Sequence, residues 1–163
     1  MNSTDQLKHI KRWIKASALQ EFRKHLSGMP LYVEGEDKVA NDRKHIEFRI
    51  DGPYVKPHGT AGNYRAYVEI NLLGNSTRSN DNVYERENLQ GLMLSVLMRD
   101  FCVYKIGNKN SRAVQVPEDD GSLLEVMLLM TSEDIKVSDF GRIDTAEVYQ
   151  ATAEAHYEMF FQL

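Results

Sequence analysis

Hydrophobic residues recur at three- and four-residue steps in the first part of the chain. These positions share one side of a helix and are Leu7, Ile10, Ile14, Ala18, Phe22 and Leu26. A polar residue at positions 3–5 can cap the start of such a helix, and Gly28 and Pro30 follow its end. The pattern predicts an amphipathic helix over residues 5–27, followed by a short strand at residues 31–33.

The period changes to two after residue 43, which is typical of strands with one buried face. Ile46, Phe48 and Ile50 alternate with polar residues, and a second alternation runs over residues 63–73. Residues 52–62, between these two segments, are rich in glycine and proline. We therefore expect a long antiparallel hairpin that carries an eleven-residue projecting loop.

A second helix is predicted after a polar connector at residues 74–82. Asn82, with Glu85 three residues later, makes a start that is similar to a capping box. The apolar stripe of this helix consists of Leu89, Leu92, Met93, Val96 and Leu97. We expect it to be the main buried helix. Gly91 costs a helix up to about 1 kcal/mol relative to alanine, so we expect it to pack closely against a neighbouring element.

The remaining segments are predicted as strands. Residues 103–106 and 113–116 are candidate short strands, and the apolar run at residues 123–130 is the candidate central strand, covered on both faces. Every second residue from 149 to 163 is apolar, which predicts a strand. The alanine and glutamate content favours a helix instead, so a helix in the first half of this segment, within residues 145–156, is the alternative to the predicted strand.

The predicted elements combine into one α+β domain over residues 1–163. We expect an antiparallel or mixed sheet of about four to six strands with a long hairpin, packed against the N-terminal amphipathic helix and one central helix. A hydrophobic share of 42% and a charged share of 27% agree with a single globular domain. The longest apolar stretch, at residues 126–130, is too short to cross a membrane, so no membrane partner is expected.

Charge is distributed unevenly along the chain, whose net charge is −4. Up to residue 25 there are two acidic residues and six basic ones, which are Lys8, Lys11, Arg12, Lys15, Arg23 and Lys24. The basic side of the first helix is either a solvated face or a surface for a charged partner. Its cations are too few to indicate nucleic-acid binding.

Two carboxylates invite comparison with one class of enzyme. Asp51 ends a predicted strand and Glu69-Ile70-Asn71 lies on the next one. This order is similar to that of metal-dependent nucleases of the restriction-endonuclease type, except that Asn71 stands where those enzymes have a lysine. Such a carboxylate pair can hold a divalent ion, but an outward position on a half-exposed sheet explains both residues equally well.

No other grouping supports catalysis or cofactor binding. The five histidines lack the spacing of a metal motif, and the single Cys102 allows neither a disulfide nor a Cys-His zinc cage. The sequence also has no nucleophile elbow and no phosphate-binding glycine loop. We therefore predict no catalytic, cofactor-binding or metal residues, no cofactor and no enzymatic activity.

The glycine- and proline-rich segment and the basic helix are the surfaces expected to contact partners. The candidate interface residues are Pro53, Tyr54, Lys56 and His58 in the segment, and Lys11, Arg12 and Lys15 on the helix. Ordinary solvated loops on a monomer are the alternative interpretation of these surfaces.

In the order of its elements, the chain resembles the phage tail terminators and related neck and tail-completion proteins. The resemblance rests on the N-terminal helix, residues 49–53, the hairpin strand at residues 64–71, the central helix and residues 154–161. It covers most of the chain and contains no diagnostic motif. It implies a structural virion subunit that forms a closed homo-oligomeric ring, with six subunits as the expected number, which caps the tail tube and joins it to the head.

The resemblance also implies partners and a location. The expected partners are further copies of the chain, the tail-tube protein and the head–tail connector or neck protein, and the only expected nucleic acid is DNA that passes through the ring. The expected location is the tail or neck of the virion, after assembly in the host cytoplasm. Two functions of other classes stay open, namely the nuclease and a monomeric adaptor that binds one host protein.

Overall fold

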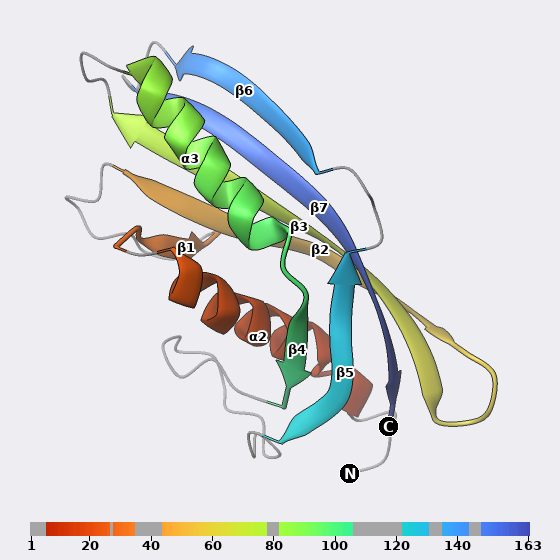
Figure 1. The fold of residues 1–163 in the computed structure, drawn as a ribbon. Coiled ribbons are helices and arrows are strands. Elements are labelled where there is room, and N and C mark those ends of the chain that lie inside the picture. Colours follow the sequence, from red (N-terminus) through yellow and green to blue (C-terminus); the bar gives the residue numbers. More distant parts are fainter. Residues whose placement is uncertain are drawn as a thin grey trace.

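The computed structural model describes residues 6–26, 28–34, 44–77, 82–105, 122–130, 135–143 and 148–163. This part of the chain forms two helices and seven strands (Figure 1). In chain order they are α2 (Ile10–His25), β1 (Leu31–Val33), β2 (His45–Pro57), β3 (Asn63–Thr77), α3 (Asn82–Leu97), β4 (Phe101–Tyr104), β5 (Leu123–Met130), β6 (Lys136–Ile143) and β7 (Val148–Gln162).

The strands join into one mixed sheet in the order β1-β2-β3-β7-β5-β4, with β6 also paired to β7. β1 and β2 are parallel, and the other pairs are antiparallel. β3 and β7 pair over their whole length, from Asn63 opposite Gln162 to Thr77 opposite Val148. On its other edge, β7 is paired first with β6 and then, at Tyr157 and Glu158, with β5. The predicted α+β class is therefore confirmed.

Both helices pack on the same face of the long strands (Figure 1). The ring of Phe22 in α2 lies 6.0 Å from that of Phe48 in β2, and α3 covers Gly74 of β3 through the side chain of Leu89. On the opposite face of β2, β3 and β7, no helix of the described part of the chain is packed. We call this second surface the open face.

Helix α2 contributes more to the core than α3, contrary to the expectation that the central helix would be the main buried one. Its fully buried side chains include Trp13, Ile14 and Phe22. Besides β2, Phe22 contacts Phe101 of β4, and the centroids of these two rings are 5.8 Å apart. The hydroxyl of Ser17 accepts a hydrogen bond from the backbone N–H of Tyr104 at 2.9 Å. Strand β4 therefore covers the side of α2 that the long strands leave free.

The predicted eleven-residue loop of the hairpin is wrong. Strand β2 continues to Pro57 and β3 begins at Asn63, so only residues 58–62 connect them. The register shifts between Asp51 and Tyr54, where Gly52 and Pro53 form an irregularity within the strand. Gly52 has a φ of +92°, which a residue with a side chain rarely adopts. Glycine and proline therefore mark a bulge here rather than the end of the strand.

Two further strand predictions are corrected by the sheet order. The strand at residues 123–130 exists as β5, but it lies beside the edge strand β4, and the central positions belong to β3 and β7. Strand β6 raises the number of strands above the expected range. It was not predicted because its apolar residues, Val137, Phe140 and Ile143, lie three apart rather than two. The candidate strand at residues 113–116 lies outside the described residues.

Strand β7 confirms the prediction from alternation and excludes the helix from residue 148 onward. Its inward residues Ala151, Ala153, Ala155, Tyr157, Met159 and Phe161 are all buried. Nine of the fifteen residue pairs with β3, those of residues 148–156, would have to break for a helix to form in the first part of this strand. Tertiary pairing and burial thus outweigh the helix propensity of alanine and glutamate.

The buried hydroxyl of Tyr157 gives a testable pH dependence. It donates a hydrogen bond to the backbone carbonyl of Leu97 at the end of α3. Burial, with a smaller contribution from the charge of Asp100, raises the pKa of Tyr157 above its ordinary value. The unfolded chain loses this proton near pH 10, whereas the folded protein retains it. We therefore expect the free energy of unfolding to fall as the pH rises above about 10.

Tyr157→Phe should lower the free energy of unfolding by about 1–2 kcal/mol at pH 7, because it leaves the Leu97 carbonyl without its donor. It should also reduce the loss of stability above pH 10. Urea denaturation from pH 7 to pH 11 measures both effects, with Tyr84→Phe as the control because Tyr84 is 67% exposed. Equal pH profiles for the Tyr157→Phe variant and the unchanged protein would contradict the expectation.

Candidate functional site

Three paired strand segments form an extension of the sheet that we call the arm. It consists of residues 54–57 of β2, residues 63–67 of β3 and residues 158–162 of β7, with the connecting residues 58–62. The β2–β3 hairpin of the arm reaches beyond both helices, at the lower right of Figure 1. A platform that projects in this way is available to another molecule.

Hydrogen bonds hold the end of the arm in one conformation. The N–H of His58 donates to the carbonyl of Asn63 at 2.9 Å, and the Asn63 side chain donates to the hydroxyl of Thr60 at 2.6 Å. The N–H of Leu163 donates to the carbonyl of Gly62 at 2.9 Å, which ties β7 to the connection between β2 and β3. The side chains on the arm therefore stand on an ordered backbone.

Five side chains on the open face of the arm form a group that we call the arm cluster. Its members are Tyr54, His58, Arg65, Tyr67 and Phe160. Tyr54 lies opposite Tyr67 in the register, and Arg65 lies opposite Phe160. The Arg65 guanidinium is 4.6 Å from the ring centroid of Tyr67 and 5.4 Å from that of Phe160, and the Phe160 ring is 5.0 Å from that of His58.

An ion pair fixes the arginine at the centre of the arm cluster. Arg65 Nη2 donates to a carboxylate oxygen of Glu158 at 2.8 Å. This hydrogen bond raises the pKa of Arg65 above its ordinary value, and partial burial opposes the shift. The charge of Arg65 is therefore permanent, and its guanidinium is held close to two aromatic rings, a geometry that favours cation–π attraction.

The arm cluster leaves a large apolar surface exposed to solvent. Tyr54 is 68% exposed and Phe160 is 47% exposed, although both stand on regular strands. Tyrosine, phenylalanine and arginine are enriched where proteins contact each other, and they account for much of the binding energy there. The residue types exposed on this surface are therefore those that are common in protein interfaces.

The helix-facing side of the arm borders a separate hollow of about 440 Å³. It is lined by Leu7, Ile10, Lys11, Gly52, Pro53, Val55, Pro57 and Tyr64. Most of this lining is apolar, with Lys11 as its cation. The hollow lies between the start of the first helix and the bulge of β2.

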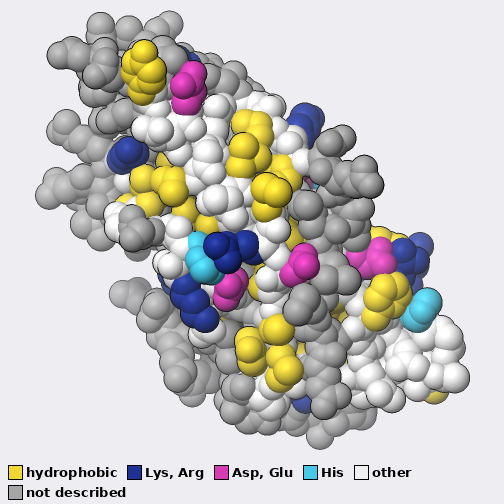
Figure 2. All heavy atoms as spheres, in the orientation of Figure 1, with side chains coloured by type: hydrophobic (Ala, Val, Ile, Leu, Met, Phe, Trp, Pro, Cys, Tyr) yellow, Lys and Arg dark blue, Asp and Glu magenta, His cyan; other side chains and the backbone are white. Residues whose placement is uncertain are grey.

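The seven predicted interface residues thus divide between different surfaces. Tyr54, Lys56 and His58 lie on the exposed part of the arm, whereas Pro53 and Lys11 meet in the hollow on its other side. The remaining two, Arg12 and Lys15, are half-buried on α2 and do not line the hollow. Figure 2 shows that, among the described side chains, basic and acidic groups are interspersed on the helix-bearing side, with no continuous basic field.

Sequence reasoning missed Arg65, Tyr67 and Phe160 as site residues. The alternation correctly placed Arg65 and Tyr67 on the outward side of their strand, but many outward residues carry no function. The signal that identifies them is the register of the three strands. Tyr67 lies opposite Tyr54, and Arg65 lies between Lys56 and Phe160, which are its partners on the two neighbouring strands. That register was not available from the pattern of a single strand.

The carboxylates of the nuclease comparison do come together, farther along the open face. Asp51 and Glu69 are direct partners in the register of β2 and β3. The Asn71 amide donates to Glu69 at 3.0 Å and to Asp51 at 3.3 Å, and Arg49 pairs with Asp51 at 3.4 Å. The position where the nucleases have a lysine is thus occupied by an amide that bridges the two carboxylates. The described lining of the adjacent hollow, of about 360 Å³, contains no lysine.

Comparisons with known proteins add no assignment. No protein-family model matches the sequence, and no curated protein matches it. Neither helix in the described part of the chain is long and apolar enough to span a membrane. The surfaces of the protein are therefore the basis for assigning a function.

Proposed function

We propose that this protein is a structural subunit of a phage tail, a tail terminator or neck protein without catalytic activity. Copies of the chain assemble into a ring that caps the tail tube and joins it to the head. The observation that carries the proposal is the projecting arm with its exposed cluster of Tyr54, His58, Arg65, Tyr67 and Phe160. The resemblance in element order supports the same class of protein.

A closed ring requires two different surfaces on each subunit, because each copy contacts the next in a head-to-tail manner. The arm supplies one surface, at one end of the sheet. The body of the subunit, with α2, α3 and the strands that they cover, supplies the other. Burying Tyr54 and Phe160 against a neighbour removes apolar area from water, which favours association by about 25 cal/mol per Å². The loss of translational and rotational entropy on association opposes this gain.

The proposal includes the partners that such a ring needs. One side of the ring binds the tail-tube protein and the other binds the head–tail connector or neck protein, with six subunits as the expected number. The protein reaches its place in the virion after assembly in the host cytoplasm. The net charge of −4 per chain limits non-specific adhesion to the DNA that passes through the ring.

Capping of tubes tests this function. When the protein is added to tail-tube protein that is polymerising in vitro, we expect shorter tubes with a ring at one end, as seen by negative-stain electron microscopy. Tubes grown with the variant Tyr54→Ala should be as long as tubes grown without added protein, because the substitution weakens the exposed contact surface. Tubes of equal length with and without the unchanged protein would overturn the proposal. Magnesium-dependent DNA cleavage that is lost on Asp51→Ala would favour the nuclease in its place.

A further inference from the structure

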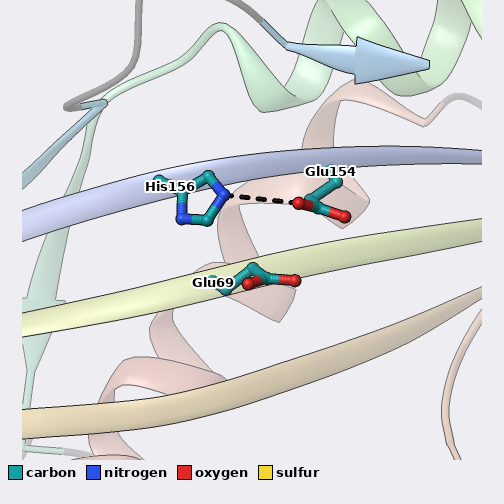
Figure 3. A group of neighbouring side chains, drawn as sticks. All are labelled: Glu69, Glu154 and His156. Carbon is teal, nitrogen blue, oxygen red and sulfur yellow. Dashed lines mark hydrogen bonds and ion pairs between the residues drawn. The ribbon is translucent and has the colours of Figure 1, made fainter.

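Two carboxylates and an imidazole stand together on the open face, next to the arm cluster along β3 and β7. Glu69 projects from β3, and Glu154 and His156 project from β7 toward it (Figure 3). One ligand-type atom from each of the three side chains lies within 4.8 Å of the other two. His156 Nε2 and Glu154 Oε1 are already 3.3 Å apart.

The strand register fixes this arrangement. Glu69 is the direct partner of His156 across the β3–β7 pair, and Asn71 is the direct partner of Glu154. Directly opposed residues of an antiparallel pair have Cβ atoms about 4.5–5.5 Å apart, and residues two apart on one strand share a face. The three side chains are therefore attached to two central strands that pair over fifteen positions, which gives them a stiff common support.

Apart from the contact between His156 and Glu154, the two carboxylates have no basic partner in the described part of the chain. In the described part of the chain, neither Glu69 nor Glu154 forms an ion pair with lysine or arginine, since Arg49 pairs with Glu34 and Asp51, and Arg65 pairs with Glu158. Lys136 of β6 lies opposite Glu154 in the register and is exposed, but forms no ion pair with it. Glu69 receives one hydrogen bond, from the Asn71 amide.

We infer that Glu69, Glu154 and His156 bind a divalent cation of the zinc class. The combination of one imidazole nitrogen with two carboxylates suits Zn²⁺ better than Mg²⁺ or Ca²⁺, which prefer oxygen ligands alone. Ligand atoms about 2.0–2.2 Å from a tetrahedral zinc are about 3.3 Å apart, so small rotations of the side chains suffice to close the group. Water completes the fourth position, because His156 is exposed.

This inference departs from the prediction that no metal residues exist. That prediction rested on the lack of histidine and cysteine motifs along the chain, and it explained Glu69 as an outward residue of a half-exposed sheet. The three residues here come from strands that are distant in sequence. The spacing of Glu154 and His156, two apart on a strand, is the local signal that was available. The inference is also independent of ring assembly, because none of the three residues belongs to the arm cluster.

Titration of the full chain with Zn²⁺, followed by isothermal calorimetry, tests the site. We expect saturable binding of one ion per chain, and affinity at least about tenfold weaker in His156→Ala and in Glu154→Gln, since even the loss of a partner that supports a metal ligand costs 10- to 100-fold. His58→Ala is the matched control, because His58 is exposed on the arm and should leave the affinity unchanged. Lys136→Ala should tighten binding by removing a nearby positive charge.

Absence of saturable Zn²⁺ binding to the unchanged protein would overturn the inference, and so would equal affinity in His156→Ala and the unchanged protein. Thermal melts of each variant without added metal show whether the fold is retained. Glu69→Gln provides a second test on the neighbouring strand if a β7 variant unfolds. A negative result for zinc binding would not count against the proposed ring, because assembly is measured separately and without added metal.

Discussion

Tyr54→Ala should prevent self-assembly at concentrations at which the unchanged protein forms rings, and it should leave the fold intact. The side chain is 68% exposed, so its removal costs the core nothing. Truncating a central aromatic residue of an interface typically costs about 2 kcal/mol or more, which is roughly 30-fold in affinity per contact. Each subunit of a closed ring repeats the same contact with its neighbours, so the loss is repeated around the ring.

Size-exclusion chromatography with light scattering measures the loss of assembly, and thermal melts measure the fold. His58→Ala should act in the same direction, because the His58 ring packs against Phe160. The matched control is Tyr84→Ala on α3, where the tyrosine is equally exposed, at 67%, but lies outside the arm. Unchanged assembly in both Tyr54→Ala and His58→Ala would remove the reason for assigning the contact to the arm.

Gly74→Ala should destabilise the protein by about 1–3 kcal/mol, the usual cost of overpacking a core. A Cβ atom at Gly74 would lie 2.6 Å from Cδ2 and 2.8 Å from Cγ of Leu89. Leu89 is 1% exposed, so its side chain has no free space into which it can move. The glycine is therefore what allows α3 to pack closely on β3.

Chemical denaturation of two further variants tests this explanation. Gly91→Ala is the control, because a Cβ at Gly91 meets nothing within 4 Å, and alanine should stabilise the helix by up to about 1 kcal/mol. Combining Gly74→Ala with Leu89→Ala should give less than the sum of the two separate losses, since the smaller side chain relieves the collision. Strictly additive effects would show that the two residues do not compete for the same space.

The contrast between these glycines shows what the sequence pattern can reveal about packing. Gly91 was expected to pack closely because glycine is costly in a helix, yet it is exposed. Gly74 was assigned to a polar connector, yet it lies in β3 beneath α3. A glycine shows only that a position tolerates the absence of a side chain. Which neighbour uses the space depends on the tertiary arrangement.

Strands were predictable where burial imposed a simple alternation. Strand β7 followed it over its whole length, and the prediction held against helix propensity because every inward side chain from Ala151 to Phe161 is buried. Strand β5 was recognised as a strand, but its position was not, since an apolar run does not specify its neighbours. The Gly52-Pro53 pair was misinterpreted because a bulge and a loop share the same residue preferences.

The candidate sites were less predictable than the fold. Tyr54 and His58 were selected because of a loop that proved to be mostly strand. The structure sets Tyr54 opposite Tyr67 and places His58 beside Phe160. The register likewise creates the group of Glu69, Glu154 and His156. Alternation tells which side of a strand a residue occupies, but pairing decides which residues meet there.

The mass of the purified protein in solution tests the central claim most directly. Light scattering over a wide range of protein concentrations should give a discrete multiple of the 18.7 kDa chain, with six copies as the expected number, and negative-stain images of the same sample should show rings. A mass of one chain at the highest concentration, even with tail-tube protein present, would contradict the proposal of a ring-forming subunit.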